Sequence, residues 1–131
     1  MKDVTIGACA SAELTVNDQN LAVNVGSGSL EVFATPEMVM LMEKAACKCM
    51  EQFIDDGETT VGTEMNVKHI AATPKGMTVT ANACVTEVNG REIVFKVTAS
   101  DQSGAIGEGI HKRFLVNSEK FTAKTYSKLD K

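Results

Sequence analysis

Residues 36–54 contain no glycine and are rich in Met, Leu, Ala, Glu and Lys, which are good helix formers. Thr35 stands at the expected N-cap, Pro36 occupies the first helical position, and Asp55–Gly57 closes the segment. Apolar side chains cover well over half of its circumference, and they are Met38, Val39, Leu41, Met42, Ala45, Ala46, Cys49, Met50 and Phe53. This pattern predicts one long core helix that other elements surround.

After this helix the apolar period changes to two, which is typical of β-strands. Four segments show the alternation, at residues 61–70, 77–86, 93–100 and 105–116. The links between them, at 74–76, 89–90 and 102–104, are short and rich in turn residues, so consecutive strands should be antiparallel. Residues 12–16 and 30–34 are shorter strand candidates that precede the helix.

A long apolar helix followed by four antiparallel strands predicts an α+β domain with the hot-dog fold. In this fold one long central helix is wrapped by a curved antiparallel β-sheet. A chain of 131 residues has room for one domain, which we expect to span residues 1–131. Such a sheet leaves an edge strand available, so we expect a homodimer or a higher homo-oligomer that covers this edge.

The charge of the chain argues against several classes of partner. A formal net charge of -4 at pH 7 repels phosphate backbones and anionic lipid surfaces, so we expect no nucleic acid and no membrane as partner. The longest apolar run, residues 38–42, is far shorter than the roughly 18 residues of a membrane span. Residues 1–5 carry an acid and polar side chains where a signal peptide needs basic and apolar regions. We therefore expect a cytoplasmic protein.

The four cysteines predict neither a disulfide nor a metal site. Cys47 and Cys49 are two positions apart in the predicted helix and point in different directions, while Cys9 and Cys84 stand among Ala and Thr. The spacing of a zinc site is also missing, because the chain has no Cys-x-x-Cys and only two histidines. We expect four reduced, mostly buried thiols, no metal and no cofactor.

Glu43 lies on an apolar face of the predicted helix, where its neighbours at helical spacing include Val39, Cys47 and Met50. A carboxylate in such a place is partly desolvated, which is how a general base is adapted to work near neutral pH. The alternative is an ordinary surface glutamate that pairs with Lys44 or another cation. The spacing alone leaves both interpretations open.

His69 ends the segment 61–70 and shares the parity of its apolar positions, so it should point toward the helix. A lone inward histidine is most often a hydrogen-bonded core residue, yet this one faces the helix that carries Glu43. Thr35 has two interpretations as well. Its hydroxyl could cap the helix, or it could join the free N–H groups of the helix start in holding a carbonyl or an oxyanion.

His111 and Arg113 share a parity opposite to that of Ile110 and Phe114. We therefore expect both side chains to face away from the apolar side of their strand. Residues in such positions are usually solvated. Alternatively, the two side chains contact a phosphate-bearing ligand or a partner chain.

Motifs surround the candidate residues in three places, and they are Val32-Phe33-Ala34-Thr35-Pro36 with Leu41-Met42-Glu43, Thr60-Val61-Gly62-Thr63 with Val67-x-His69-Ile70-Ala71-Ala72-Thr73-Pro74, and His111-x-Arg113-Phe114. Together they resemble the fluoroacetyl-CoA-specific thioesterase-like family of hot-dog proteins. By this resemblance Thr35, Glu43 and His69 correspond to the family's catalytic threonine, glutamate and histidine. Gly62 corresponds to a backbone contact near the acyl group and Arg113 to a coenzyme A contact, and we place His111 with them among the substrate-binding residues.

The resemblance implies a thioesterase that hydrolyses a short or small acyl-CoA to the free acid and coenzyme A. Glu43 would act as general base or as nucleophile, while Thr35 and His69 position the carbonyl. Fluoroacetyl-specific members resemble one another in aromatic gate residues shortly before the threonine, whereas residues 26–29 here are only Gly and Ser. We therefore expect an acyl group other than fluoroacetyl.

Thr35 and Glu43 are eight positions apart, which is about 12 Å along a helix axis and too far for a hydrogen bond. We therefore expect a composite site at a dimer interface, to which each protomer contributes a part. Two other interpretations stay open, namely a module that binds acyl-CoA without turnover and a structural protein in which these polar residues only cap, pair and pack. A hot-dog dehydratase is weaker, because it would favour an Asp and His pair that the sequence does not show.

Overall fold

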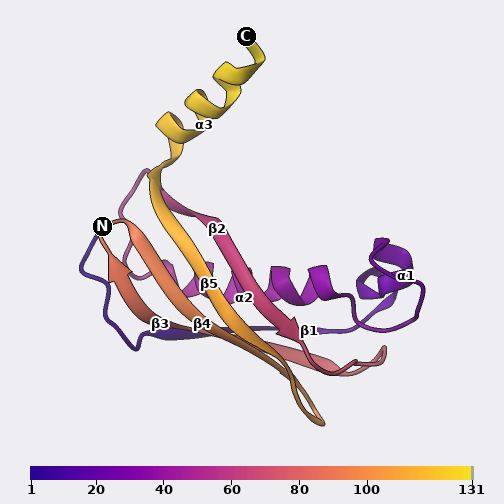
Figure 1. The fold of residues 1–131 in the computed structure, drawn as a ribbon. Helices are drawn as coiled ribbons and strands as arrows, with labels where there is room; N and C mark the ends of the chain where they lie inside the picture. The colour runs from indigo at the N-terminus through magenta and orange to yellow at the C-terminus, as the bar shows by residue number, and fades with distance from the viewer. Residues whose placement is uncertain (131) are drawn as a thin grey trace.

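The computed structural model describes residues 1–130. Its elements in chain order are β1 (Cys9–Thr15), η1 (Asp18–Asn20), α1 (Ala22–Val25), α2 (Thr35–Met50), β2 (Glu58–His69), β3 (Thr78–Asn89), β4 (Glu92–Asp101), β5 (Gly104–Asn117), α3 (Ser118–Tyr126) and η2 (Ser127–Asp130). Figure 1 shows α2 lying across the curved sheet, whereas α3 extends away from it at the C-terminal end. Within residues 1–130, no helix is long and apolar enough to cross a membrane.

The five strands form one sheet in the order β1-β3-β4-β5-β2, and every neighbouring pair is antiparallel. The helix α2 packs against this sheet, mainly against β1 and β3. The predicted α+β hot-dog fold, with one central helix wrapped by an antiparallel sheet, is therefore confirmed. The edges of the sheet are β1 and β2.

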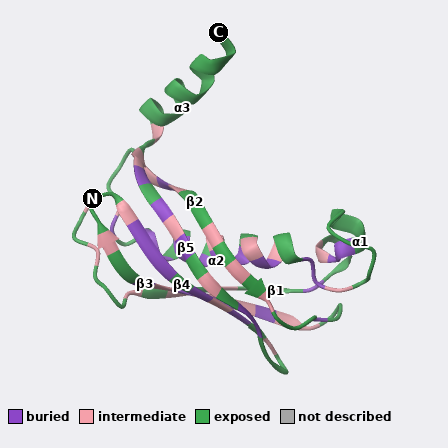
Figure 2. Cartoon of the chain, in the orientation of Figure 1, coloured by how far each residue is buried: buried purple, intermediate pink, exposed green. Residues whose placement is uncertain are grey.

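The core lies between α2 and the inner face of the sheet. Figure 2 shows buried residues along β4 and on α2, whereas α3 is exposed. Most of the predicted apolar face of the helix is buried, and the buried residues of α2 are Met38, Leu41, Met42, Ala45, Ala46, Cys49 and Met50. Each large side chain among them contributes roughly 1.5–3 kcal/mol by leaving water. Burial of this face fixes how α2 is rotated, and so fixes where its polar residues point.

The ends of α2 differ from the prediction. Its N-cap is Ala34, and no side chain makes a capping hydrogen bond there, so Thr35 is the first helical residue rather than the cap. The helix ends at Met50, before the predicted residue 54. After it the chain turns, because the N–H groups of Phe53 and Ile54 both donate to the Met50 carbonyl. The hydroxyl of Thr35 is thus not used in capping.

The segment 30–34, a strand candidate in the sequence, forms only isolated bridges. Phe33 bridges to Leu21, and Val32 bridges to Pro74. The segment therefore lies outside the sheet and leads directly into α2.

A β-bulge reverses the alternation of side chains in β2. Thr63 has no partner in β5, because Gly62 and Glu64 pair with consecutive residues there. The inward positions are even-numbered before this bulge and odd-numbered after it. By strict alternation Val61 and Thr63 share the parity of His69, so all three are predicted to point inward. The bulge makes this prediction wrong for Val61 and Thr63, whereas the inward orientation of His69 is correct.

A second bulge occurs in β5. Ile106 has no partner in β4, because Ala99 and Ser100 pair with Gly107 and Ala105 on either side of it. Ile106 itself is buried. From Gly107 onward the odd-numbered residues of β5 point inward.

The bulge at Ile106 overturns the predicted orientation of His111 and Arg113. Both are buried, with 1% and 6% of their surface exposed, whereas Ile110 and Phe114 are 39% and 40% exposed. The apolar side chains of this stretch thus lie on the outer face of the sheet, and the polar pair lies beneath it against α2. One extra residue is enough to exchange the two faces.

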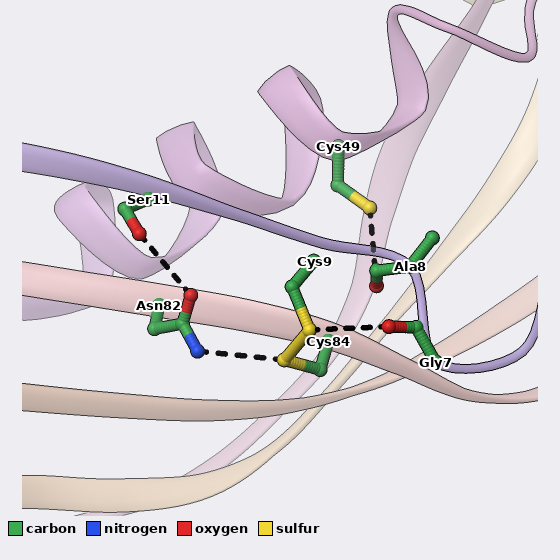
Figure 3. Close-up of a disulfide and its surroundings, with 7 residues drawn as sticks. All are labelled: Gly7, Ala8, Cys9, Ser11, Cys49, Asn82 and Cys84. Carbon is green, nitrogen blue, oxygen red and sulfur yellow. Dashed lines mark hydrogen bonds between the residues drawn. A yellow bond between two sulfur atoms is a disulfide. The ribbon is translucent and has the colours of Figure 1, made fainter.

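One disulfide joins Cys9 of β1 to Cys84 of β3 (Figure 3). The two residues lie directly opposite each other in the register, and their Cα atoms are 4.1 Å apart. The prediction of four reduced thiols is therefore wrong, because strand pairing brings together cysteines that are 75 positions apart in sequence. Cys47 and Cys49 are free, and the buried Cys49 thiol donates to the Ala8 carbonyl at 3.5 Å.

Candidate functional site

The first residue of α2 and the last residue of β2 meet at one end of the helix. Thr35 Oγ1 and His69 Nδ1 are 2.8 Å apart, which is hydrogen-bonding distance. The ring of Phe33 meets the imidazole edge-on, with the ring centroids 6.5 Å apart. Because Thr35 does not cap the helix, its hydroxyl is free to make this bond. The structure therefore brings together two of the three residues that the sequence predicts to be catalytic.

The second ring nitrogen of His69 has no partner. Nε2 is buried and makes no hydrogen bond within residues 1–130. Burial lowers the pKa of His69 from its ordinary value of 6.5, and the backbone of Ala71 opposes this shift only in part. An unpaired buried nitrogen costs free energy, so this atom calls for a partner, such as a ligand or an ordered water, that completes its hydrogen bonding.

A pocket of about 290 Å³ opens beside this pair. Phe33, Thr35 and His69 line one part of it, and the loop at residues 70–72 lines another. Ser27, from the loop after α1, also reaches the pocket, and residues 26–29 of this loop are only Gly and Ser. Small side chains therefore line part of the pocket, whereas Phe33, His69 and Ile70 line the rest.

Glu43 belongs to a different cluster, eight residues further along α2. Its side chain is 43% exposed, so the carboxylate is only partly desolvated. Oε2 accepts from Arg113 Nη1 at 3.4 Å, while Oε1 has no donor among the described residues. Pairing with a cation, which the sequence left open, therefore does occur, but the cation comes from β5 rather than from the neighbouring Lys44.

The guanidinium of Arg113 is buried and almost fully used within the chain. Nε donates to Thr60 Oγ1 at 2.8 Å and Nη2 donates to the Thr60 carbonyl at 2.9 Å. Nη1 donates to His111 Nε2 at 3.1 Å, in addition to Glu43. These bonds anchor Arg113 to β2 on one side and leave Nη1 directed at Glu43 on the other.

His111 lies next to Arg113 on the inner face of β5. Its Nδ1 is 2.8 Å from the carbonyl oxygen of Glu64. Its ring stacks on Phe95 of β4, with centroids 6.2 Å apart and planes inclined by 28°. Burial lowers the pKa of His111 from 6.5, the hydrogen bond to Glu64 opposes this, and the positive charge of Arg113 lowers the pKa further.

Gly62 is the position at which β2 passes close to the carboxylate. A Cβ atom there would lie 2.8 Å from Glu43 Oε2 and 3.3 Å from His111 Cε1. Any larger residue at this position would have to displace the end of the Glu43 side chain. A second pocket, of about 220 Å³, opens over Glu43, Gly62, Met65 and His111.

The six predicted site residues thus fall into two groups. Thr35 and His69 form one, while the other consists of Glu43, Gly62, His111 and Arg113. Sequence reasoning missed Thr60 as the anchor of Arg113, although it stands in the motif around Gly62. It also missed the roles of the Glu64 carbonyl and the Phe95 ring, for which only the strand register could have given a signal. Among residues 1–130, no group of three or more His, Cys, Asp and Glu is placed to hold a metal ion.

Comparisons with known proteins agree with this architecture. A family model described as fluoroacetyl-CoA-specific thioesterase (FlK) matches residues 16–119. Over 98 residues, the chain is 45% identical to the fluoroacetyl-CoA thioesterase of Streptantibioticus cattleyicolor, which covers 75% of this chain and 70% of that protein.

Solved structures give the same result. One of the fluoroacetyl-CoA thioesterase FlK matches with a TM-score of 0.91 and 34% identity, over 97% of this chain and 98% of that one. A thioesterase superfamily member from Thermus thermophilus matches with a TM-score of 0.90 and 26% identity, over 99% and 96% of the two chains. Structures of FlK mutants contain fluoroacetate with CoA, or acetyl-CoA.

Proposed function

Because the chain belongs to the fluoroacetyl-CoA-specific thioesterase family of hot-dog thioester hydrolases, we propose that it hydrolyses a short or small acyl-CoA to the free acid and coenzyme A. One observation carries this proposal. The hydroxyl and imidazole of Thr35 and His69 form a bonded pair with an unpaired nitrogen beside a pocket, while Glu43 is held by one oxygen and keeps the other free.

We propose further that a complete site needs two protomers. The two groups of residues are about 12 Å apart along α2, yet both border the edge strand β2, which carries Gly62 near one cluster and His69 in the other. If two copies pair antiparallel along β2, a two-fold axis midway between Gly62 and His69 brings the Glu43 cluster of one protomer beside the Thr35–His69 pair of its partner. The homodimer then has two equivalent sites.

In such a site the thioester carbonyl lies between the two groups. Glu43 uses its free oxygen either to take a proton from an attacking water or to attack the carbonyl carbon and form an anhydride that water then hydrolyses. Thr35 and His69 orient the carbonyl and stabilise the negative charge that develops on its oxygen. Cleavage of the carbon–sulfur bond releases the coenzyme A thiolate. In either route the hydrolytic water loses one proton, and this proton neutralises the thiolate, either directly from Glu43 or from solvent, with His69 placed to transfer it.

The bonding of Arg113 and His111 argues for a role different from the predicted substrate contact. The guanidinium donates to Thr60, His111 and Glu43, which leaves little capacity for the phosphates of coenzyme A. We therefore assign Arg113 to holding Glu43. For Gly62 the predicted role stands as a proposal, in which its backbone lies near the acyl group.

The pocket beside His69 supports a small acyl group without an aromatic gate. Ala22 and Ser27 border it, and residues 26–29 are only Gly and Ser.

The proposed hydrolase activity is tested by a thiol-release assay over acetyl- to octanoyl-CoA, fluoroacetyl-CoA, and several branched and aromatic thioesters. Turnover of one or more short thioesters is expected. Binding of acyl-CoA without release of thiol, seen as a raised melting temperature, would instead make the protein a non-catalytic acyl-CoA-binding module.

The shared site is tested by mixing two inactive variants, Glu43→Gln and His69→Ala. In a heterodimer, one of the two composite sites combines the intact Glu43 with the intact histidine of the other chain. Mixing and re-equilibrating equal amounts should therefore restore about a quarter of the wild-type activity, since half of the dimers are mixed and each has one complete site. No recovery, together with demonstrated exchange of subunits, would place all three residues of each site in one chain.

A further inference from the structure

His111 differs from the other site residues because both of its ring nitrogens are already committed within the fold. We propose that His111 is a positioning residue, whose imidazole accepts a hydrogen bond from Arg113 and thereby holds the guanidinium that fixes the Glu43 carboxylate. The distances Nη1 to Nε2 of 3.1 Å and Nη1 to Oε2 of 3.4 Å define this relay. The inference rests on the proposed function, in which Glu43 acts on the thioester.

The partners of His111 determine where its proton lies. The Glu64 carbonyl oxygen can only accept a hydrogen bond, so Nδ1, 2.8 Å away, carries the hydrogen. Arg113 can only donate, so Nε2 must be the unprotonated nitrogen. His111 is therefore neutral, in the Nδ1–H tautomer. Only this form satisfies both neighbours at once.

Of the two charges that face His111, Arg113 favours this neutral form by lowering the pKa, whereas Glu43 opposes it. Arg113 faces it from its own strand and Glu43 faces it from α2, whereas β2 presents the Glu64 carbonyl and β4 presents the Phe95 ring. A proton on Nε2 would remove the acceptor for Arg113 and would place a second cation against the guanidinium. Burial and the charge of Arg113 both lower the pKa of His111, so its neutral form persists below pH 6.5.

Loss of the acceptor has a direct consequence for the carboxylate. Nη1 of Arg113 divides its donation between His111 and Glu43, while Thr60 holds the remainder of the guanidinium. Without His111, Nη1 has Glu43 as its one partner in the chain. We expect the guanidinium and the carboxylate then to draw together, so that Glu43 moves inward and away from the thioester.

The tautomer can be measured on the wild-type protein. The chain has only two histidines, so a long-range ¹H–¹⁵N spectrum of ¹⁵N-histidine-labelled protein is easily assigned with a His69→Gln variant. We expect a protonated Nδ1 and an unprotonated Nε2 for His111 at neutral pH, and titration below 6.5. A protonated Nε2, or a doubly protonated ring at neutral pH, would overturn the proposal.

The positioning role is measured by kinetics on the acyl-CoA that the wild-type protein hydrolyses best. His111→Phe keeps the flat ring against Phe95 but removes the acceptor, and it should lower kcat by about 10- to 100-fold with KM changed less than about threefold. His111→Gln can present an amide oxygen to Arg113 and should recover kcat to within about fivefold of wild type. An unchanged kcat in the folded His111→Phe variant, or equal losses in both variants, would disprove the role.

A control separates this role from general destabilisation. Cys49→Ala removes a buried side chain from α2, the helix that also carries Glu43, but it does not touch Arg113 or His111. This variant should lower the melting temperature without changing kcat or its pH profile. The proposed function and the role of His111 can be disproved separately. A wild-type protein that releases no thiol from any acyl-CoA refutes the proposed function, whereas an active wild type with a kinetically normal His111→Phe variant refutes only the assignment of His111.

Discussion

The two histidines of this chain occupy opposite kinds of environment. His111 donates from one nitrogen to a backbone carbonyl and accepts at the other from a buried guanidinium. His69 contacts Thr35 with one nitrogen, and its other nitrogen has no partner among the described residues. Both are desolvated enough to have a lowered pKa, so burial alone does not distinguish them. The difference lies in which hydrogen bonds remain to be made.

This comparison separates a group that can react from a group that supports. An imidazole with a free nitrogen at a pocket can exchange a proton or bind a carbonyl, whereas one with two satisfied nitrogens can only hold its neighbours in place. Glu43 combines both properties, because one oxygen is held by Arg113 and the other is free. The largest effects on turnover should therefore follow changes to the free atoms, and smaller effects should follow changes to the bonded ones.

Glu43→Gln should have the largest effect. The amide keeps the size of the side chain but removes its basicity and most of its nucleophilicity, so kcat should fall by about 10²- to 10⁴-fold. The measurement is thiol release under saturating acyl-CoA, with circular dichroism as the control for folding. Wild-type turnover in this variant would remove Glu43 from the chemistry and leave it as a surface ion-pair partner.

His69→Ala should follow, with a loss of about 10²- to 10³-fold, which is typical when one group that stabilises an oxyanion is removed. The variant also leaves Thr35 without its 2.8 Å partner. The two histidines are compared directly by measuring kcat and KM for His69→Ala and for His111→Ala. If His69→Ala and His111→Ala lose activity equally, the distinction between a reacting and a supporting histidine is wrong.

Gly62→Ala tests whether the position of the Glu43 carboxylate depends on the absence of a side chain at this point of β2. A Cβ atom 2.8 Å from Oε2 must displace the carboxylate, and a displacement of about 1 Å can cost about 10²-fold in rate. The control is the same substitution in a Glu43→Ala background, where there is no carboxylate to displace. The further loss in that background should be small, and an additive loss would show that Gly62 acts independently of Glu43.

The disulfide allows the stability of the fold to be changed without altering any residue that is bonded to either histidine. Cys9 and Cys84 join β1 to β3, and β3 is separated from β5 by β4 in the sheet order. Replacing both by serine should lower the free energy of unfolding by about 2–4 kcal/mol, as measured in denaturant, because the bridge closes a long loop of the unfolded chain. Turnover at low temperature should stay within about twofold of wild type. A larger loss of kcat would connect the β1–β3 pair to the site.

Much of this architecture follows from local patterns in the sequence. The composition of residues 36–54 predicts the helix that the structure shows at Thr35–Met50, and the period of two predicts the four strands that follow it. Of the motif residues, Thr35 and His69 line one pocket and Glu43 lines another. These features depend on near neighbours, such as helix propensity, side-chain alternation and turn chemistry, which the sequence displays directly.

The errors arose where one extra residue or a distant pairing decides the outcome. The bulges at Thr63 and Ile106 exchange the two faces of their strands, and alternation alone does not reveal a bulge. For this reason Arg113 was expected to face outward. The disulfide depends on the register between strands that lie 75 positions apart, which no local pattern encodes.

The smallest expected effect is a dependence of stability on mildly acidic pH. Burial lowers the folded-state pKa of both His69 and His111 below 6.5, so the unfolded chain binds protons first as the pH falls. The free energy of unfolding should therefore decrease as the pH falls below about 6.5. Asp55, Glu58 and Asp101 have lowered pKa values, and their contribution is lost only at more acidic pH, below their ordinary values of 3.8 to 4.5.

Denaturant titrations at about pH 7 and about pH 5.5 can therefore isolate the two histidines. His111→Gln and His69→Gln should each reduce the loss of stability between these conditions, because each removes one group that takes up a proton on unfolding. The reduction for His111 should remain when acyl-CoA is bound, since its partners are within the fold, whereas bound ligand should alter the contribution of His69 through its free nitrogen. Equal responses of the two variants to ligand would contradict the contrast between the two sites.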